Sequence, residues 1–240
     1  NEIRSIHLTR DDFDPFYLYL TFIIHNPTEK DTIRTIRSVD GGYSWSDTVH
    51  NSADNTYYDC DICVSGSTIR LVGHYYLTSG EGMTLVEYTS RGMQYNGGTI
   101  IVMNSDTLNK KIEYPRVGAT TTSPDSTQLV YVFYSRRDST SGNWNLLYRY
   151  KSNGTWSSIT PDTLHKGSVS PVYSDIRGRQ SDESQYIDIV YTDISPGTFY
   201  SYTNYCRYAD ESNPESWSDT VAAGSGIFWS YPELTFSPGS

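Results

Sequence analysis

The sequence is poor in positive charge and has no long apolar run. Its 240 residues include 18 Lys and Arg against 28 Asp and Glu, which gives a net charge of −10. Nucleic-acid binding depends on a basic surface that neutralises phosphates, so we expect no nucleic-acid partner. No apolar stretch approaches the roughly 18 residues that a membrane-spanning helix needs, so we expect no transmembrane segment.

Cysteine is also scarce. The chain has three, Cys60, Cys63 and Cys206, and an odd number cannot form a complete disulfide framework. Cys60 and Cys63 are spaced as C-x-x-C, but they lie in an alternating run. On a strand, residues three apart point to opposite faces, which suits neither a metal site nor a redox pair. We therefore interpret both as small buried hydrophobic residues.

Motifs for cofactors and metals are missing as well. The sequence contains no nucleophile elbow, phosphate loop, dinucleotide fingerprint or EF-hand, and its five histidines show no metal-ligand spacing. The acidic run of Asp11, Asp12 and Asp14 lacks the glycine and the terminal glutamate of a calcium loop. We expect an exposed charged turn there, and the sequence predicts no cofactor and no metal.

Tyrosine, in contrast, is abundant. The chain has 22 Tyr, 5 Trp and 7 Phe, which is enough bulky apolar surface for a core and excludes wholesale disorder. No Pro/Gly/Ser-rich linker or charge block divides the chain into halves of different composition. The sequence therefore predicts one domain, covering residues 1–240.

Internal repeats are the strongest signal in the chain. The pentapeptide Trp-Ser-Asp-Thr-Val occurs at 45–49 and again at 217–221, with a related segment at 154–160. A second series of markers opens alternating apolar runs at Tyr58, Tyr114, Ser170 and Tyr231, which are spaced by 56, 56 and 61 residues. Both series have the same period.

Each repeat contains four runs with the alternation of a β-strand and none with the period of a helix. The third unit predicts strands over 116–122, 128–135, 145–150 and 155–160. The other units predict strands over 3–9, 16–24, 32–38 and 44–49, over 57–64, 69–77, 83–88 and 99–103, and over 172–177, 186–191, 200–207 and 216–221. A single four-stranded sheet leaves faces and edges unburied, and radial packing of several such sheets gives a β-propeller. We predict an all-β propeller of antiparallel blades.

The repeat units are predicted at about 1–56, 57–112, 113–168 and 169–226. Residues 227–240 then supply either a strand that closes a ring of four blades or the first strand of a further blade in a ring of five or more. The sequence leaves this choice open.

One turn carries a family resemblance. Ser38, Asp40, Gly42 and Trp45 match the four key positions of Ser/Thr-x-Asp-x-Gly-x-x-Trp/Phe, so the segment resembles the Asp-box of sialidase-like, or BNR-repeat, propellers. Asp40 can accept backbone N–H bonds across the turn and Gly42 can adopt a positive φ. The resemblance implies a propeller fold and a structural role for the four residues, away from any active site.

The resemblance does not identify an enzymatic reaction for this chain. Sialidases need three arginines for the substrate carboxylate, an aspartate acid/base, and a tyrosine nucleophile assisted by glutamate. Their first arginine stands in an Arg-Ile-Pro sequence, which does not occur in this chain. Arg116, after Pro115, is the nearest analogue. We assign no catalytic residue.

Candidate ligand residues lie where the first strand of each repeat reaches the axis of the propeller. Alignment of the repeats brings Arg116 and Glu233 to one equivalent position, next to Tyr58, Tyr114 and Tyr231. Loop residues Trp144 and Trp229 are further candidates, because exposed aromatic side chains stack on sugars or bury in protein partners.

Three functions fit these observations. The first is a secreted or cell-surface, non-catalytic propeller module that binds glycan or an extracellular protein; few lysines and a glycosylation triplet at Asn153 favour export. The second is a diverged sialidase-like glycoside hydrolase, for which Arg116, Glu233 and Asp61 are the first residues to test. The third is an architectural surface protein that associates with itself. Fold alone does not decide among them.

Overall fold

Most of the chain that the structure describes is β-strand. The computed structural model describes residues 2–11, 13–45, 47–52, 56–77, 80–104, 111–123, 126–158, 160–180, 185–195, 201–210 and 213–226. A short 3-10 turn, η1 (Ser90–Gly92), separates two of the strands. Within the described residues, no helix is long and apolar enough to cross a membrane.

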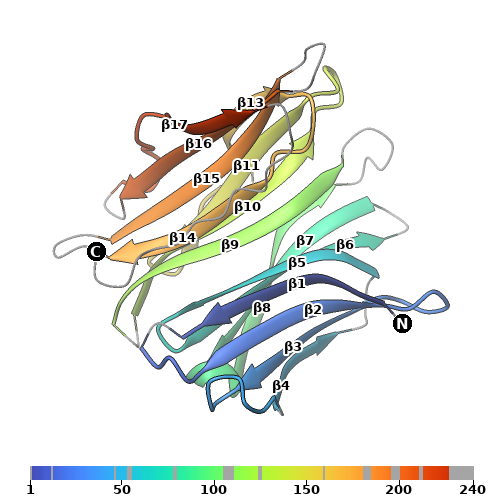
Figure 1. Cartoon of the computed structure of the whole chain (residues 1–240), viewed down its shortest axis with the longest axis vertical. Helices are drawn as coiled ribbons and strands as arrows, with labels where there is room; N and C mark the ends of the chain where they lie inside the picture. The colour runs from blue at the N-terminus through green and yellow to red at the C-terminus, as the bar shows by residue number, and fades with distance from the viewer. Residues whose placement is uncertain are drawn as a thin grey trace.

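The described strands form four antiparallel sheets, each of which is one blade of a β-propeller (Figure 1). Blade 1 consists of β1 (Glu2–Arg10), β2 (Leu18–His25), β3 (Thr32–Ser38) and β4 (Asp47–Ser52). Blade 2 consists of β5 (Thr56–Ser65), β6 (Thr68–Leu77), β7 (Gly80–Thr89) and β8 (Gln94–Asn104). Blade 3 consists of β9 (Ile112–Ser123), β10 (Ser126–Arg137), β11 (Trp144–Ser152), β12 (Thr155–Trp156) and β13 (Asp162–Ser168). Blade 4 consists of β14 (Ser174–Gln180), β15 (Gln185–Ser195), β16 (Ser201–Asp210) and β17 (Val221–Gly226).

The predicted all-β propeller is therefore confirmed, with two local differences at blade edges. In blade 3, the predicted fourth strand over 155–160 is only the two-residue β12, and β13 pairs with β11 beside it. In blade 4, the outer strand is β17 rather than 216–221, where Trp217 forms only an isolated bridge to Ala209. Apolar alternation did not mark β13 or β17, because outer strands bury less of their surface than inner ones.

Local sequence explains the strands and their turns. In β2 the side chains of Tyr19, Thr21 and Ile23 are buried, and they alternate with less buried neighbours, as expected for a strand with one face on the core. Between β11 and β12, Asn153 and Gly154 both have positive φ, 46° and 80°. This is the conformation that a two-residue hairpin turn of type I′ requires, and Asn-Gly adopts it most readily.

Among the described residues, the core consists of three layers, each between two consecutive blades. The first cluster joins blades 1 and 2, and its members include Ile23, Ile33 and Ile69. The second joins blades 2 and 3, and the third joins blades 3 and 4. Each blade is thus stabilised by burial of its faces against its neighbours, which is how a propeller compensates for sheets that are too small to fold alone.

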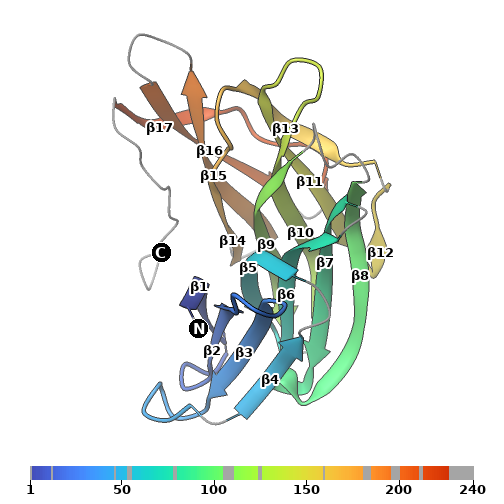
Figure 2. The same ribbon diagram turned by 90° about the vertical axis from the view of Figure 1, so that its right-hand side faces the viewer.

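The first strand of each blade lies innermost. β1, β5, β9 and β14 run side by side through the middle of the molecule in Figure 1, and Figure 2 shows the outer strands of each blade spreading away from them. Contacts between these strands advance in the same direction along both partners. Ser5 and then His7 of β1 contact Cys60 and then Asp61 of β5. Asp61 and then Ser65 of β5 contact Val117 and then Thr120 of β9, and Arg116 and then Gly118 of β9 lie against Ser174 and then Ile176 of β14. The four inner strands are therefore parallel, and their equivalent ends meet.

The repeated Trp-Ser pair has a common structural role in blades 3 and 4. Ser157, after Trp156, donates its backbone N–H to the Tyr150 carbonyl, and Ser218, after Trp217, donates to the Tyr208 carbonyl, both at 2.8 Å. In each blade the arginine that precedes that tyrosine, Arg149 or Arg207, donates to the carbonyl of the same serine. The repeat therefore holds the segment before the outer strand against the third strand.

The turn between β3 and β4 is closed by the residues that match the Asp-box pattern. Asp40 accepts hydrogen bonds from the Ser38 hydroxyl at 2.7 Å and from the Ser44 N–H at 2.9 Å, and the Gly42 N–H donates to Ser38 Oγ. The Trp45 indole donates to the Gly42 carbonyl. The bonds from Ser44 and Ser38 lower the pKa of Asp40 to about 2.

The acidic run after β1 differs from the expectation of an exposed turn. Asp11 is buried, and its carboxylate accepts the N–H groups of Phe13 and Asp14. Arg91 of blade 2 donates to the same carboxylate at 3.1 Å. Asp11 therefore closes a turn and joins two blades. Sequence reasoning missed this because the partner lies 80 residues away.

Candidate functional site

The inner strands of blades 1 to 3 border a cavity of about 760 Å³. Four tyrosines, Tyr58, Tyr76, Tyr114 and Tyr173, line it, and we call it the tyrosine cavity. The other described lining residues are Ser5, Ile6, His7, Asp59, His74, Glu81, Lys111, Ile112, Glu113 and Arg116. Its volume lies within the range of about 300 to 1,000 Å³ that is usual for small-molecule sites.

Three successive inner strands carry a β-bulge at the rim of this cavity. The register of β1 shifts between Arg4 and His7, that of β5 shifts at Tyr58, and that of β9 shifts between Glu113 and Arg116. A bulge redirects side chains and is frequent next to functional sites. Because the bulges recur in equivalent places, all three strands turn side chains toward the cavity.

The backbone is strained at two of these bulges. Ser5 and Tyr114 have φ of 49° and 55°, although neither is glycine, and Tyr114 also precedes Pro115. A non-glycine residue in the left-handed region costs about 1 to 3 kcal/mol, and such residues cluster at functional sites. Both strained residues, Ser5 and Tyr114, line the tyrosine cavity.

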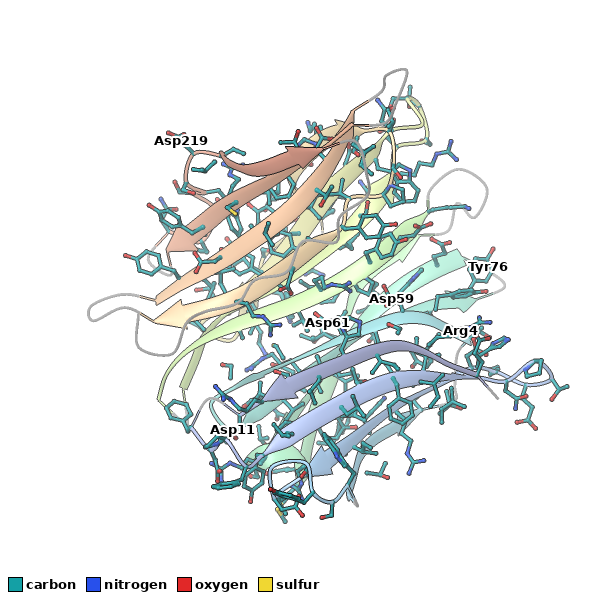
Figure 3. The ribbon with its side chains drawn as sticks, in the orientation of Figure 1. Arg4, Asp11, Asp59, Asp61, Tyr76 and Asp219 are labelled. Carbon is teal, nitrogen blue, oxygen red and sulfur yellow. The ribbon has the colours of Figure 1, made fainter. Side chains whose placement is uncertain are left out.

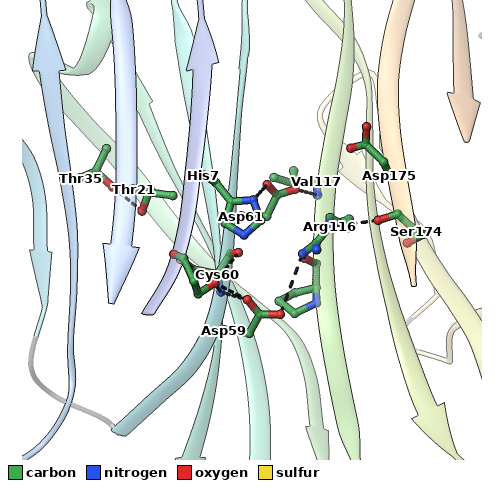
Figure 4. A network of polar contacts seen from close by, with 12 residues as sticks. His7, Thr21, Thr35, Asp59, Cys60, Asp61, Arg116, Val117, Ser174 and Asp175 are labelled. Atoms are coloured by element: carbon green, nitrogen blue, oxygen red, sulfur yellow. Dashed lines mark hydrogen bonds and ion pairs between the residues drawn. The ribbon is translucent and has the colours of Figure 1, made fainter. Parts of the chain in front are cut away.

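Asp59 is the carboxylate at the centre of the cavity wall. The Ser5 hydroxyl of β1 donates to Asp59 Oδ1, and Arg116 Nη1 of β9 lies 3.9 Å from Oδ2 (Figure 4). Burial raises the pKa of Asp59 above its ordinary value, while the charge of Arg116 and the bond from Ser5 oppose that rise. Asp59 is therefore a poorly solvated acid held between two blades.

Asp61 follows on the same strand in a different electrostatic environment. His7 Nδ1 lies 3.1 Å from Oδ1, and the Val117 N–H donates to Oδ2 at 2.9 Å. Burial alone would raise the pKa of Asp61, but the hydrogen bond and charge of His7, the charge of Arg116 and the Val117 N–H together lower it. Figure 3 shows Asp59 and Asp61 close together near the middle of the molecule.

Two glutamates complete the acidic wall. Glu81 of β7 accepts the backbone N–H of Ile112 at 2.7 Å. Burial raises the pKa of Glu81 and of Glu113, and the charge of Lys111 partly offsets the rise in both. The cavity thus brings three carboxyl groups with raised pKa together on neighbouring strands.

The tyrosines form two aromatic pairs at the rim. The Tyr58 ring stands edge-on to Tyr76 at 6.1 Å between centroids and lies 5.9 Å from the ring of His74. The rings of Tyr114 and Tyr173 are 4.3 Å apart, and their hydroxyls are joined by a hydrogen bond of 3.0 Å. Tyr58 is 54% exposed, which leaves a free aromatic surface at the cavity.

Arg116 lies at the cavity but is partly engaged within the protein. Its Nε donates to the Ser174 carbonyl at 3.1 Å and its Nη1 donates to the Pro115 carbonyl at 2.7 Å. With the contact to Asp59, it links β5, β9 and β14 (Figure 4).

The structure brings together Tyr58, Tyr114 and Arg116 of the predicted ligand residues. Glu233, Tyr231 and Trp229 lie outside the described residues, as do residues 227–240 as a whole. Trp144, expected in an exposed loop, is instead buried as the first residue of β11 and does not line the tyrosine cavity. Its apolar ring packs better inside the blade than in water.

Asp61 also differs from expectation. It does not line the described part of the cavity, and its two oxygens are bound by His7 and Val117. Of the three residues named first for a test of hydrolysis, only Arg116 lines the described part of the cavity, and Glu233 lies outside the described residues. Sequence reasoning missed Asp59, Glu81 and Glu113. The signal was present for two of them, since Asp59 and Glu113 adjoin the repeat markers Tyr58 and Tyr114.

The described residues contain no group of three or more His, Cys, Asp and Glu side chains placed to hold a metal ion. Within the described residues the three cysteines form no disulfide, and Cys60 and Cys63 are buried as predicted. Burial raises the pKa of the Cys60 thiol to about 12, so it is not a nucleophile at neutral pH.

Comparisons with known proteins agree on the fold. No protein-family model and no curated protein sequence matches the chain. An α-L-arabinanase of Penicillium chrysogenum in complex with arabinobiose is similar, with a TM-score of 0.62 and 14% identity over 91% of this chain and 66% of the arabinanase chain. A β-1,2-mannobiose phosphorylase of Listeria innocua in complex with β-1,2-mannobiose has a TM-score of 0.54 and 11% identity over 91% of this chain and 76% of its own.

The NanB sialidase of Streptococcus pneumoniae aligns with a TM-score of 0.49 and 14% identity, over 80% of this chain and 28% of its own. This chain spans about two thirds of the length of the arabinanase. At these identities the likeness is one of fold alone.

Proposed function

We propose that this propeller binds carbohydrate in the tyrosine cavity. The observation that carries the proposal is that one cavity combines the exposed ring of Tyr58 with the carboxyl groups of Asp59, Glu81 and Glu113. Apolar sugar faces pack on aromatic rings, and sugar hydroxyls donate charge-assisted hydrogen bonds to carboxylates. Two of the proteins that share this fold have a disaccharide in their complexes, arabinobiose and β-1,2-mannobiose, which supports the same class of ligand.

A second candidate is hydrolysis of a glycosidic bond at the same site. Glycosidases use two carboxyl groups, one of them a general acid whose pKa is raised. The raised pKa of Asp59, Glu81 and Glu113, which all line the cavity, favours this candidate. Binding without cleavage remains the first proposal, because the tyrosines and carboxylates need no further residue to hold a sugar.

The test is a glycan-array screen of the purified chain, with detection of released products and calorimetry on every glycan that is retained. We expect saturable binding that weakens at least tenfold in Tyr58→Ala, which corresponds to loss of one stacked ring. Tyr95→Ala is the matched control, because Tyr95 is 61% exposed on blade 2 and does not line the cavity.

The outcomes separate the two candidates. Retention without product supports a binding module, while release of sugar that is lost in Glu113→Gln or Asp59→Asn supports a hydrolase. Equal binding by wild type and Tyr58→Ala would show that the ligand sits elsewhere, and silence on all glycans would overturn the carbohydrate proposal.

We also propose a secreted or cell-surface location and membership of the sialidase-like propellers. The first is supported by the composition, and the second by the hydrogen-bonded turn of Ser38, Asp40, Gly42 and Trp45. Cell fractionation with the natural host tests the location.

A further inference from the structure

A second cavity lies farther along the same inner strands. It has a volume of about 460 Å³. Its described lining residues are Leu8, Thr9, Arg10, Leu18, Cys63, Val64, Gly118, Ala119, Ile176, Arg177 and Gly178. All four inner strands contribute to it, and β1 and β14, the first strands of the first and last described blades, face it together. We call it the arginine cavity, after Arg10 and Arg177.

The two cavities are separate places in the fold. On each strand, the residues of the arginine cavity follow those of the tyrosine cavity: Leu8 follows His7 on β1, and Gly118 follows Arg116 on β9. The contacts of Asp61 with His7 and with the Val117 N–H lie between the two cavities along the inner strands (Figure 4). A ligand in one cavity is therefore not the ligand of the other.

The arginine cavity has the opposite charge from the tyrosine cavity. Its described lining residues include two arginines and no acidic residue. Arg10, at the end of β1, is exposed and forms no ion pair or side-chain hydrogen bond with the described residues. For Arg177, the nearest described carboxylate is Asp175 on its own strand, 3.7 Å from Nε. In a chain with a net charge of −10, a cavity whose described charged lining residues are both arginines is a local exception.

The floor of the cavity is formed by closely packed backbone. Gly118 and Gly178 have no side chain because β9 and β14 approach each other there: an added Cβ at Gly178 would meet the Ala119 carbonyl, and one at Gly118 would meet the Ile176 side chain. Thr9 adds a hydroxyl. In the described sheets β1 pairs only with β2, and β14 only with β15, so the inner edges of both strands have backbone N–H groups outside the ladders.

We propose that the arginine cavity binds a small oxyanion, which Arg10 and Arg177 hold from opposite sides. Guanidinium groups match the oxygens of carboxylate, sulfate and phosphate, and two of them around one anion offset the cost of its desolvation. The anion is either a free inorganic ion or an acidic group on a sugar. Both have the same recognition chemistry, and the site does not depend on the carbohydrate proposal for the tyrosine cavity.

The test is calorimetric titration of the whole chain with sodium sulfate, sodium phosphate and sodium glucuronate at constant ionic strength, with sodium chloride as the reference. We expect saturable binding of at least one oxyanion and none of chloride. Affinity should fall at least tenfold in Arg10→Gln and in Arg177→Gln. Arg4→Gln is the matched control, since Arg4 is an exposed arginine on β1 that lines neither described cavity.

Modification of arginines by phenylglyoxal gives a second measurement that needs no variant. Mass spectrometry of the wild-type chain should show Arg10 and Arg177 protected by the anion that binds, while Arg4 stays reactive. Binding of glucuronate but not of inorganic ions assigns the cavity to an acidic sugar, and the reverse assigns it to a free ion. The absence of saturable binding, unchanged affinity in both variants, or equal protection of Arg4 would overturn the proposal.

Discussion

His7 of β1 and Asp61 of β5 join the first two blades through a contact of 3.1 Å between Nδ1 and Oδ1. Val117 of β9 completes the link by donating its N–H to the other carboxylate oxygen. One carboxylate thus holds three inner strands at equal height, at the level between the two cavities. This contact sets the relative position of the side chains on either side of it.

Asp61→Asn should destabilise the protein at neutral pH. The folded pKa of Asp61 lies below its ordinary value of 3.8, so its contribution to stability is present above that pH and is lost as the pH falls through the folded pKa. We expect the free energy of unfolding to fall by about 2 kcal/mol at pH 7, the scale of a buried hydrogen bond to a charged group. Urea denaturation measures it. The difference from wild type should narrow toward pH 3, and Asp219→Asn, at an exposed site, should change little.

Glu113→Gln should have the opposite effect on stability. Burial raises the folded pKa of Glu113 above its ordinary value of 4.5, so ionisation at neutral pH opposes folding. Its favourable contribution is present below pH 4.5 and disappears as the pH rises through the folded pKa. The melting temperature of the variant should therefore exceed that of wild type at pH 7 and match it near pH 4, while carbohydrate binding weakens. A melting temperature below that of wild type at pH 7 would contradict the assignment, and Glu29→Gln serves as an exposed control.

His74 should make wild type lose stability in mild acid. Burial lowers the pKa of His74 from 6.5 to about 4, so its contribution is present above pH 6.5 and is lost as the pH falls toward 4. The loss amounts to about 3 kcal/mol when fully developed. His74→Gln should flatten the dependence of unfolding free energy on pH between these limits. If the unfolding free energy of His74→Gln depended on pH as steeply as that of wild type, other groups would be responsible for the loss of stability in acid. His25→Gln is the comparison variant.

Gly42→Ala should cost more stability than Gly154→Ala. Both glycines have positive φ, 93° and 80°, so an alanine is strained at either position by about 1 kcal/mol or more. An added Cβ at Gly42 would also lie 3.3 Å from Leu18 Cδ1, whereas at Gly154 nothing lies within 4 Å. Thermal unfolding of the two variants compares them. Equal losses of stability in the two variants would mean that the turn after β3 accommodates the added methyl group without displacing Leu18 of β2.

The repeat pattern identified residues at the rim of the tyrosine cavity, but it did not show that they form one site. The markers Tyr58 and Tyr114 were found by their spacing of 56 residues, and both lie at bulges on the cavity rim. Glu81 was not accessible in this way. It lies on β7, two strands away from the inner strand β5 in blade 2, and its bond to the Ile112 N–H shows that β7 reaches the start of β9.

The sequence by itself determined the repeating four-stranded unit, because alternation, turn residues and a fixed period are local properties that each blade carries within its own residues. Tertiary structure alone decided which side chains share a cavity. The contact of Arg116 with Asp59 and the placement of Arg10 and Arg177 at one cavity depend on parallel inner strands of different blades. The bulges on β1, β5 and β9 are register shifts within each blade, and they come to border one cavity only when the blades pack together. Residues so far apart in the chain are brought together by burial of the blade faces, and no local pattern encodes that register.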